Sequence, residues 1–308
     1  MAVDLSWSDP TAAQGSAGLA LVTGDTLTQT SWQKTVSNIY VLGGGNQEAG
    51  MLQYVSATQV RFRAVNGAWV RIAGLLYNLT ADITATNTNA SIDGTAGSTL
   101  ANSTLYYVYL FISGSTVTID FSTTAYAISS TSGNYGTYIK SGANTRTLIG
   151  MIRTNGSGEF VDSATQRFVR SWFNDPGIAG TSSLSANRTT TETSYAEINS
   201  EIRVEFLAWT GEVVTISATG TMENSTAGQS VNASIGIDDT TAEDMFNRFN
   251  NGATGGTPGS FGGTINKTGL TEGYHYATLL GYVNANTGTF YGNAAAGLRC
   301  ALTVRARR

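Results

Sequence analysis

The chain is built from short apolar or alternating segments, and each is followed within a few residues by Gly, Asn or Ser. Residues 60–65 (VRFRAV) alternate apolar and polar residues and precede Asn66-Gly67. Residues 105–112 (LYYVYLFI) are continuously apolar or aromatic and precede Ser-Gly-Ser. Alternation with a period of two predicts half-buried strands, and a short continuous apolar run predicts a strand buried on both faces. The pattern therefore favours an all-β chain.

Composition excludes several other classes. Charged residues make up 12% of the 308 residues, about half the usual ~25%. This scarcity argues against a coiled coil, and 14 Tyr, 11 Phe and 5 Trp argue against disorder. A single Cys excludes a disulfide framework. At roughly 100–200 residues per domain, the length predicts about two domains.

Charge and hydropathy limit the partners. The formal net charge of −4 offers no basic field, so no nucleic acid is expected as a partner. The N-terminal sequence MAVDLSWSDP lacks the basic region and apolar core of a signal peptide. No run approaches the ~18 apolar residues of a membrane span, so membrane insertion is not expected.

Residues 1–50 are interpreted as an attachment segment with one short helix over 31–42. Thr30 is a candidate cap, and Gly43 follows as a stop signal. The side chains of Trp32, Val36 and Ile39 fall on one helical face. About three helical turns are too short to be stable alone, so this stripe predicts an oligomer or docking contact.

Residues 51–176 are predicted to form a β domain that serves as a shaft or shoulder. The Asn66-Gly67 pair predicts a hairpin between residues 60–65 and the segment that starts at 68. Residues 116–121 and 147–153 are further strand candidates. Residues 177–187 (GIAGTSSLSAN) are small and polar and are interpreted as a linker. Residues 188–308 show strand signals every 8–12 residues, which predicts an antiparallel, jelly-roll-like β-sandwich.

The sequence lacks the residues that most catalytic mechanisms need. The single His275 and single Cys300 exclude a Cys/His zinc site, and both are interpreted as structural residues. No phosphate-binding or dinucleotide-binding glycine motif is present, so we expect no cofactor, no metal and no enzyme activity. A cluster of acids is the one remaining route to a hydrolase or a calcium site. Its members are Asp238, Asp239, Glu243 and Asp244.

Aromatic residues beside Asn, Asp, Arg and Gly in predicted loops of the last domain are the materials of a carbohydrate site. Sugar C–H faces stack on rings, while Asn, Asp and Arg side chains bond the hydroxyls. The alternative is that these rings fill the core or a subunit interface. The candidate residues are Phe246, Asn247, Arg248, Phe249, Asn250, Tyr274, Tyr291 and Asn293.

Two segments resemble bacteriophage proteins. Residues 103–127 contain a tyrosine-rich run followed by FSTT, and residues 147–174 contain TLIGMIRT followed by RSWFN. They resemble segments of tail-fibre and head-spike proteins of tailed phages and of phage-derived gene transfer agents. Residues 24–43 are similar to segments near the attachment ends of such fibres. Residues 188–308 are similar to the jelly-roll knobs, of the C1q or tumour-necrosis-factor type, that end such fibres.

This resemblance implies a structural virion protein that binds a host-surface receptor, with polysaccharide as the expected ligand. It implies attachment to other virion proteins through residues 1–50 and a homo-oligomer, with a trimer expected first and a pentamer as the alternative. The protein would be made in the host cytoplasm and reside on the particle surface. Two other functions stay open: a capsid decoration, cement or connector protein without a receptor role, and a polysaccharide depolymerase.

Overall fold

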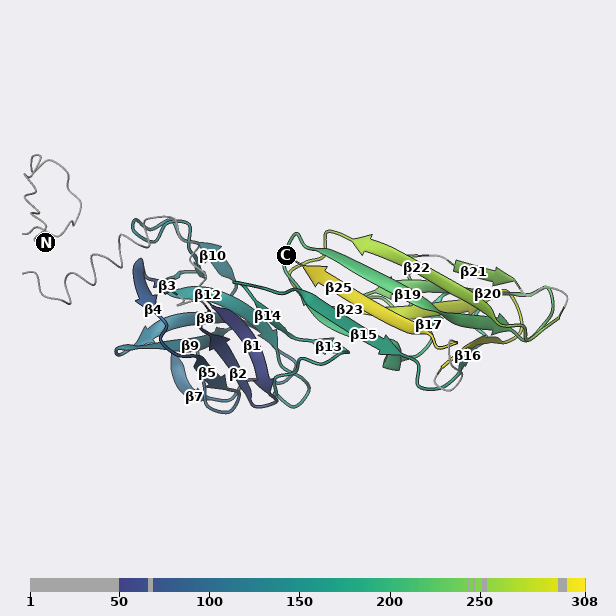
Figure 1. The fold of residues 1–308 in the computed structure, drawn as a ribbon, viewed down its shortest axis with the longest axis horizontal. Coiled ribbons are helices and arrows are strands. Elements are labelled where there is room, and N and C mark those ends of the chain that lie inside the picture. Colours follow the sequence, from purple (N-terminus) through teal and green to yellow (C-terminus); the bar gives the residue numbers. More distant parts are fainter. Residues whose placement is uncertain are drawn as a thin grey trace, which may run out of the picture. The chain divides into compact units, whose positions relative to one another are not determined.

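The computed structural model describes residues 50–65, 69–242, 244–245, 247–250, 254–292 and 298–307, which belong to one compact unit. These residues form strands and one 3-10 turn, η1 (Ser200–Ile202), so the prediction of an all-β chain is confirmed (Figure 1). The predicted helix over 31–42, with Trp32, Val36 and Ile39, lies outside the described residues.

The first β region covers residues 50–173. Its sheets have the strand orders β1-β2-β5, β10-β11-β12-β8-β9-β6-β7 and β3-β4, and β14 also pairs with β12. Its strands are β1 (Met51–Ser56), β2 (Gln59–Arg63), β3 (Trp69–Ile72), β4 (Leu75–Asn78), β5 (Ile83–Thr86), β6 (Ala90–Ile92), β7 (Thr95–Ser98), β8 (Leu105–Ser113), β9 (Thr116–Ser122), β10 (Tyr126–Ile128), β11 (Tyr138–Lys140), β12 (Ala143–Arg153) and β14 (Val169–Ser171). Strand β13 (Gln166–Arg167) lies in the same range but pairs in parallel with Glu205 and Phe206 of the second region.

Strand β8 is buried on both faces, as its continuous apolar sequence predicts. Val108 and Leu110 belong to the main core of the first region. Tyr107 and Tyr109 point to the other side, into a second cluster that also contains residues after 200. Successive side chains of a strand point to opposite faces, so one strand serves two cores.

The predicted hairpin around Asn66-Gly67 is wrong. Strand β2 pairs with β1 on one edge and β5 on the other, so no edge is left for β3, which pairs with β4 instead. The alternation itself is confirmed, because Val60 and Phe62 are fully buried. The signal correctly placed the strand but not its partner, because β1 and β5 occupy both edges of β2. Residues 66–68 themselves lie outside the described part.

The second β region covers residues 178–307. Its strands are β15 (Ile178–Ser183), β16 (Arg188–Thr190), β17 (Ala196–Glu197), β18 (Val204–Ala208), β19 (Val213–Asn224), β20 (Ser230–Ile237), β21 (Asn247–Asn250), β22 (Gly259–Lys267), β23 (Gly273–Val283), β24 (Gly288–Phe290) and β25 (Ala301–Arg307).

Eight of these strands make a jelly roll. Strands β15, β25, β19 and β22 pair in that order in one sheet, and β18, β23, β20 and β21 pair in the other. Counted along the chain from β15 without the short β16, β17 and β24, the orders are 1-8-3-6 and 2-7-4-5, which are those of two interleaved Greek keys. The long strands β15, β19, β22 and β25 lie side by side in Figure 1. The core between the sheets is apolar, combines aliphatic side chains with Phe206, Phe261 and Phe290, and includes the buried Cys300.

The predicted linker, residues 177–187, contains a strand of this jelly roll. All of β15 pairs antiparallel with β25, from Ile178 opposite Ala306 to Ser183 opposite Ala301. Ile178, Gly180 and Ser182 are buried while Ala179 and Thr181 are exposed. Small residues hid this alternation, because Gly and Ser on the inner face carry no apolar signal.

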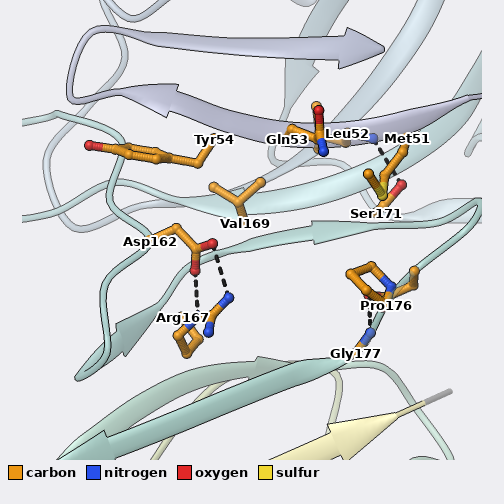
Figure 2. A pocket seen from close by; sticks show the side chains of 11 residues that line it. Met51, Leu52, Gln53, Tyr54, Asp162, Arg167, Val169, Ser171, Pro176 and Gly177 are labelled. Carbon is orange, nitrogen blue, oxygen red and sulfur yellow. Dashed lines mark hydrogen bonds and ion pairs between the residues drawn. The ribbon is translucent and has the colours of Figure 1, made fainter. Parts of the chain in front are cut away.

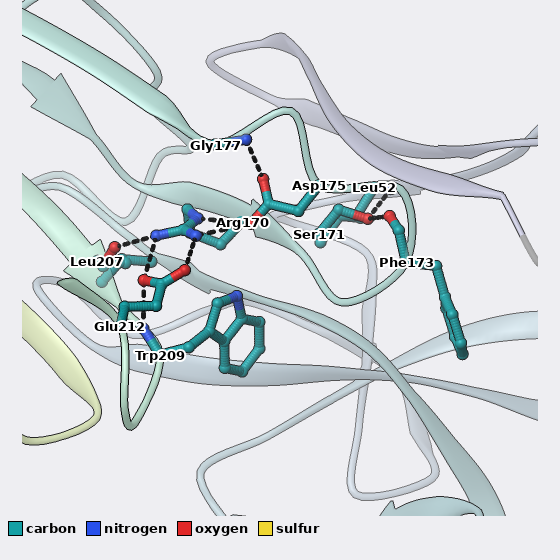
Figure 3. A network of polar contacts seen from close by, with 9 residues as sticks. All are labelled: Leu52, Arg170, Ser171, Phe173, Asp175, Gly177, Leu207, Trp209 and Glu212. Atoms are coloured by element: carbon teal, nitrogen blue, oxygen red, sulfur yellow. Dashed lines mark hydrogen bonds and ion pairs between the residues drawn. The ribbon is translucent and has the colours of Figure 1, made fainter. Parts of the chain in front are cut away.

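A buried arginine joins the two β regions. Arg170 of β14 is fully buried and forms ion pairs with Asp175 and with Glu212, each at 2.6 Å (Figure 3). Its Nη1 also donates to the backbone oxygen of Leu207, at 2.7 Å. Around it, Tyr107, Tyr109, Leu148, Met151, Phe168, Leu207 and Trp209 form a shared apolar cluster. The regions therefore meet over a packed, ion-paired contact.

Candidate functional site

Strands β18 and β23 present a row of aromatic and charged side chains on the face away from the sandwich core. Glu205 lies opposite Tyr276, and Leu207 lies opposite Tyr274. The alternating residues Phe206 and His275 point inward and are buried. We call the outward residues Glu205, Tyr274 and Tyr276, with the arginines stacked on them, the Tyr274 face.

Two guanidinium groups cover the tyrosine rings of this face. Arg153, at the end of β12, lies 4.2 Å from the ring centre of Tyr274 and 5.3 Å from that of Phe168. Arg203 lies 4.6 Å from the ring centre of Tyr276. Arg203 is also ion-paired with Glu197. The guanidinium of Arg153 has no ion pair or hydrogen bond within the described part of the chain, so its side-chain N–H groups stay available to a ligand.

The carboxylate of Glu205 is the acceptor of this face. It accepts a hydrogen bond from the hydroxyl of Tyr274 and another, at 2.6 Å, from the amide of Gln166. Burial and this hydrogen bond raise the pKa of Tyr274, so the hydroxyl stays protonated as a donor. A pocket of about 310 Å³ opens beside Glu205. It is lined by Thr165, Gln166, Ser200, Glu201, Arg203 and Glu205.

A second carboxylate approaches the same strand. Glu272, just before β23, accepts hydrogen bonds from the hydroxyls of Tyr107, at 2.7 Å, and Tyr126, at 2.8 Å. Burial first, and then the hydrogen bond from Tyr107 to Glu272, raise the pKa of Tyr107. These bonds fix the loop that enters β23, and therefore the position of Tyr274. The arrangement offers rings, carboxylates and an unpaired guanidinium, which suit a ligand rich in hydroxyl groups.

A smaller pocket of about 210 Å³ lies where β1 approaches β14 (Figure 2). Its polar walls are already engaged. Asp162 binds Arg167 through both oxygens, at 2.6 and 3.1 Å, and burial raises the pKa of Asp162 despite that pairing. The hydroxyl of Ser171 accepts from the backbone N–H of Leu52 and donates to the backbone oxygen of Phe173. The pocket therefore presents paired groups rather than open donors.

The residues predicted for a carbohydrate site do not form one cluster. Arg248 lies opposite Asn232, which lies opposite Tyr282 of β23. Tyr282 is eight residues from Tyr274 along that strand (282 − 274), or about 26 Å at ~3.3 Å per residue. Of the predicted residues that the structure describes, Tyr274 alone belongs to the Tyr274 face.

The other predicted residues lie elsewhere. Arg248 is exposed and donates to the side chain of Asn250, at 3.0 Å, and Phe249 packs against the sandwich core. Asn247 begins β21. Tyr291 donates to Glu223, at 2.8 Å. Phe246 and Asn293 lie outside the described residues.

The acidic segment 238–244 is divided among separate local contacts. Asp238 binds His275. Asp239 accepts from the backbone N–H groups of Ala242 and Thr241, and these hydrogen bonds lower its pKa. Asp244 pairs with Lys267, and Glu243 lies outside the described residues. Within the described ranges no three acidic, His or Cys side chains are grouped to hold a metal ion.

Arg153, Glu205 and Glu272 were missed by sequence reasoning. Each comes from a different segment, and the face exists only once β12, β18 and β23 are together. One signal was available: in the sequence Tyr-His-Tyr at 274–276, strand alternation places both rings on the face opposite to His275.

No family model matches the chain, and no curated protein matches it. Among solved structures, infectious bursal disease virus of the Gt strain aligns over 84% of this chain and 65% of that chain, at 13% identity and a TM-score of 0.26. T=1 particles derived from that virus align over 86% and 71%, at 12% identity and a TM-score of 0.28. An insecticidal delta-endotoxin from Bacillus thuringiensis aligns over 84% and 52%, at 9% identity and a TM-score of 0.25.

This chain therefore spans about two thirds of the first of these neighbours. At such TM-scores the likenesses carry no argument about function, which has to come from the residues of this chain. In the ranges that the structure describes, no helix has the length and apolar character needed to cross a membrane.

Proposed function

We propose that this chain is a structural virion protein of a phage or phage-like particle, a fibre or spike subunit that binds a host-surface polysaccharide. The observation that carries the proposal is the Tyr274 face, where Arg153 is held by two rings with its N–H groups unpaired among the described residues. Rings, carboxylates and a planar donor are the groups that recognise sugars. The jelly roll and the resemblance of residues 103–127 and 147–174 to fibre and spike proteins support the same proposal.

The proposed role is binding rather than catalysis. At the Tyr274 face the carboxylate of Glu205 accepts hydrogen bonds from Tyr274 and Gln166, and the carboxylate of Glu201 in the adjoining pocket is paired with Arg188. An acid and base pair for glycoside hydrolysis needs one carboxyl group free to donate a proton and another free to act on water or the sugar. Weak binding by each single subunit would be sufficient. Linked copies in a homo-oligomer raise the overall avidity by about 10²–10⁴.

The test is binding of the full-length oligomer to purified surface polysaccharides of candidate hosts, measured by biolayer interferometry. Arg153→Ala is expected to weaken binding at least tenfold. Arg153→Lys is expected to weaken it nearly as much, because Lys keeps the charge but loses the planar stacked fork. Arg305→Ala, an exposed arginine on the other sheet, is the matched control and should bind normally.

Other outcomes separate the alternatives. If Arg248→Ala abolishes binding and Arg153→Ala does not, the site lies at β21, as the sequence predicted. If no polysaccharide binds but particles lacking the protein become less stable, the chain is a decoration or cement protein. Release of oligosaccharides during the incubation would identify a depolymerase.

A further inference from the structure

The one histidine of the chain lies between two hydrogen-bond acceptors. His275 is 4% exposed. Its Nδ1 is 2.6 Å from Oδ2 of Asp238, and its Nε2 is 2.8 Å from the backbone oxygen of Thr271. The other oxygen of Asp238 accepts from the backbone N–H of Tyr276, at 2.9 Å. A carboxylate and a carbonyl have no proton to give, so both ring nitrogens must donate.

A ring that donates from both nitrogens is a charged imidazolium. In the part of the chain that the structure describes, Asp238 is the one charged side chain in contact with this ring. The ring also lies 5.8 Å from the ring of Phe206 on β18, between ring centres, and contacts the carbonyl of Thr271 before β23. Burial disfavours the charge, but the bonds to Asp238 and Thr271 outweigh it, so the pKa of His275 is raised above 6.5.

The hydrogen bonds of His275 also help to position the Tyr274 face. Thr271 directly precedes Glu272, whose carboxylate holds Tyr107 and Tyr126 of the first β region. Tyr274 directly precedes His275, so the ring fixes the residues on both sides of Glu272 and Gly273. A neutral imidazole carries one N–H and loses either the bond to Thr271 or the bond to Asp238.

We propose that His275 is a pH-controlled latch, which in its protonated form holds the loop 271–274 and thereby the contact of Glu272 with the first β region. At a pH above the titration of His275 the loop loosens, and the Tyr274 face loses its fixed geometry. The effect on ligand binding rests on the proposed function, whereas the latch itself does not.

The direct test is NMR of the full chain with 15N-labelled histidine, which gives one pair of ring signals because the chain has one His. At pH 6 both nitrogens are expected to be protonated, with a titration midpoint above 6.5. Asp238→Asn should lower the midpoint, while Asp244→Asn, an acid nearby that pairs with Lys267, should leave it unchanged. A neutral ring with one protonated nitrogen at pH 6 would overturn the proposal.

Hydrogen exchange tests the loop. After correction for the intrinsic effect of pH, exchange in the peptide 268–276 should rise about tenfold or more across the midpoint, the size expected for one charge-assisted hydrogen bond. The peptide 145–153 of β12 is the internal control and should not change. The latch would be refuted if His275 titrates while amide hydrogen exchange in the peptide 268–276 stays constant.

Polysaccharide affinity separates the two proposals. Both measurements above are made without ligand, so a chain that binds no polysaccharide but shows the loop response refutes only the proposed function. A chain that binds polysaccharide with the same affinity on both sides of the midpoint refutes the link between the latch and the Tyr274 face.

Discussion

The carboxylate of Glu212 faces the guanidinium of Arg170 as a bidentate pair, with Oε1 2.6 Å from Nη2 and Oε2 3.0 Å from Nη1. Both side chains are almost fully buried. Oε2 also accepts from the backbone N–H of Trp209, at 2.9 Å. One carboxylate therefore closes the turn between β18 and β19 and joins it to β14.

Glu212→Gln should lower the free energy of unfolding by about 3 kcal/mol, the lower end of the range for breaking a buried ion pair, because Asp175 still partners the arginine. Arg61→Ala is the control, since its pair with Asp82 is exposed and should contribute less than about 1 kcal/mol. Denaturant unfolding measures both. Equal losses for the two variants would contradict the account.

Two glycines of β22 offer a matched test of packing. A Cβ on Gly259 would lie 1.9 Å from the ring of Phe249, whereas a Cβ on Gly262 would meet Thr219 at 3.6 Å. Gly259→Ala should cost at least about 1–3 kcal/mol by overpacking, and Gly262→Ala should be nearly neutral. The thermal midpoints of the two variants check this, and an unchanged midpoint for Gly259→Ala would show that the strand moves aside freely.

The buried thiol of Cys300 should resist labelling. Burial raises its pKa to about 11, and the thiolate is the reactive form. At pH 8 a disulfide reagent should therefore react at least about a hundredfold more slowly with native protein than with denatured protein. The chain has no other Cys, so one absorbance trace reports this thiol alone. Rapid stoichiometric labelling of the native chain would be inconsistent with a buried site.

The lowered pKa of Glu197 predicts that the folded protein loses stability in acid. Burial raises its pKa, but hydrogen bonds from Arg203 and Thr278 outweigh burial, so the folded pKa lies below the ordinary 4.5. Its stabilisation is complete above pH 4.5 and is lost as the pH falls through the lower, folded value. The gap in denaturant midpoint between the native chain and Glu197→Gln should be constant from pH 7 to 5 and shrink below 4.5. A gap that widens in acid would contradict this sign.

The strands could be predicted from the sequence more reliably than their partners. Alternation correctly placed β2, the continuous apolar run correctly placed β8, and alternation gave His275 and Cys300 structural positions in the core. Pairing was harder, because Asn66-Gly67 gives no information about strands β1 and β5, which occupy both edges of β2. Strand β15 was missed because its inner face carries Gly and Ser.

The candidate site depends on long-range contacts. Tyr107 and Glu272 are 165 residues apart and meet only after both β regions have folded. Tyr274 was predicted from the residue types beside it, while Arg153 lies at the end of an apolar strand and gave no local signal. The rings of Phe168 and Tyr274 hold the guanidinium of Arg153 in place, and the sequence alone does not show that these rings lie beside Arg153.

The two faces of β8 also fix its alignment. Val108 and Leu110 belong to one core, and Tyr107 and Tyr109 belong to the other. A slip of one residue against β9 or β12 would exchange the side chains of the two faces. The hydroxyl groups of Tyr107 and Tyr109 would then lose their acceptors, Glu272 and the backbone oxygen of Thr124. No solvent-facing side exists to absorb such an error, so a one-residue insertion or deletion within β8 should disrupt both cores at once.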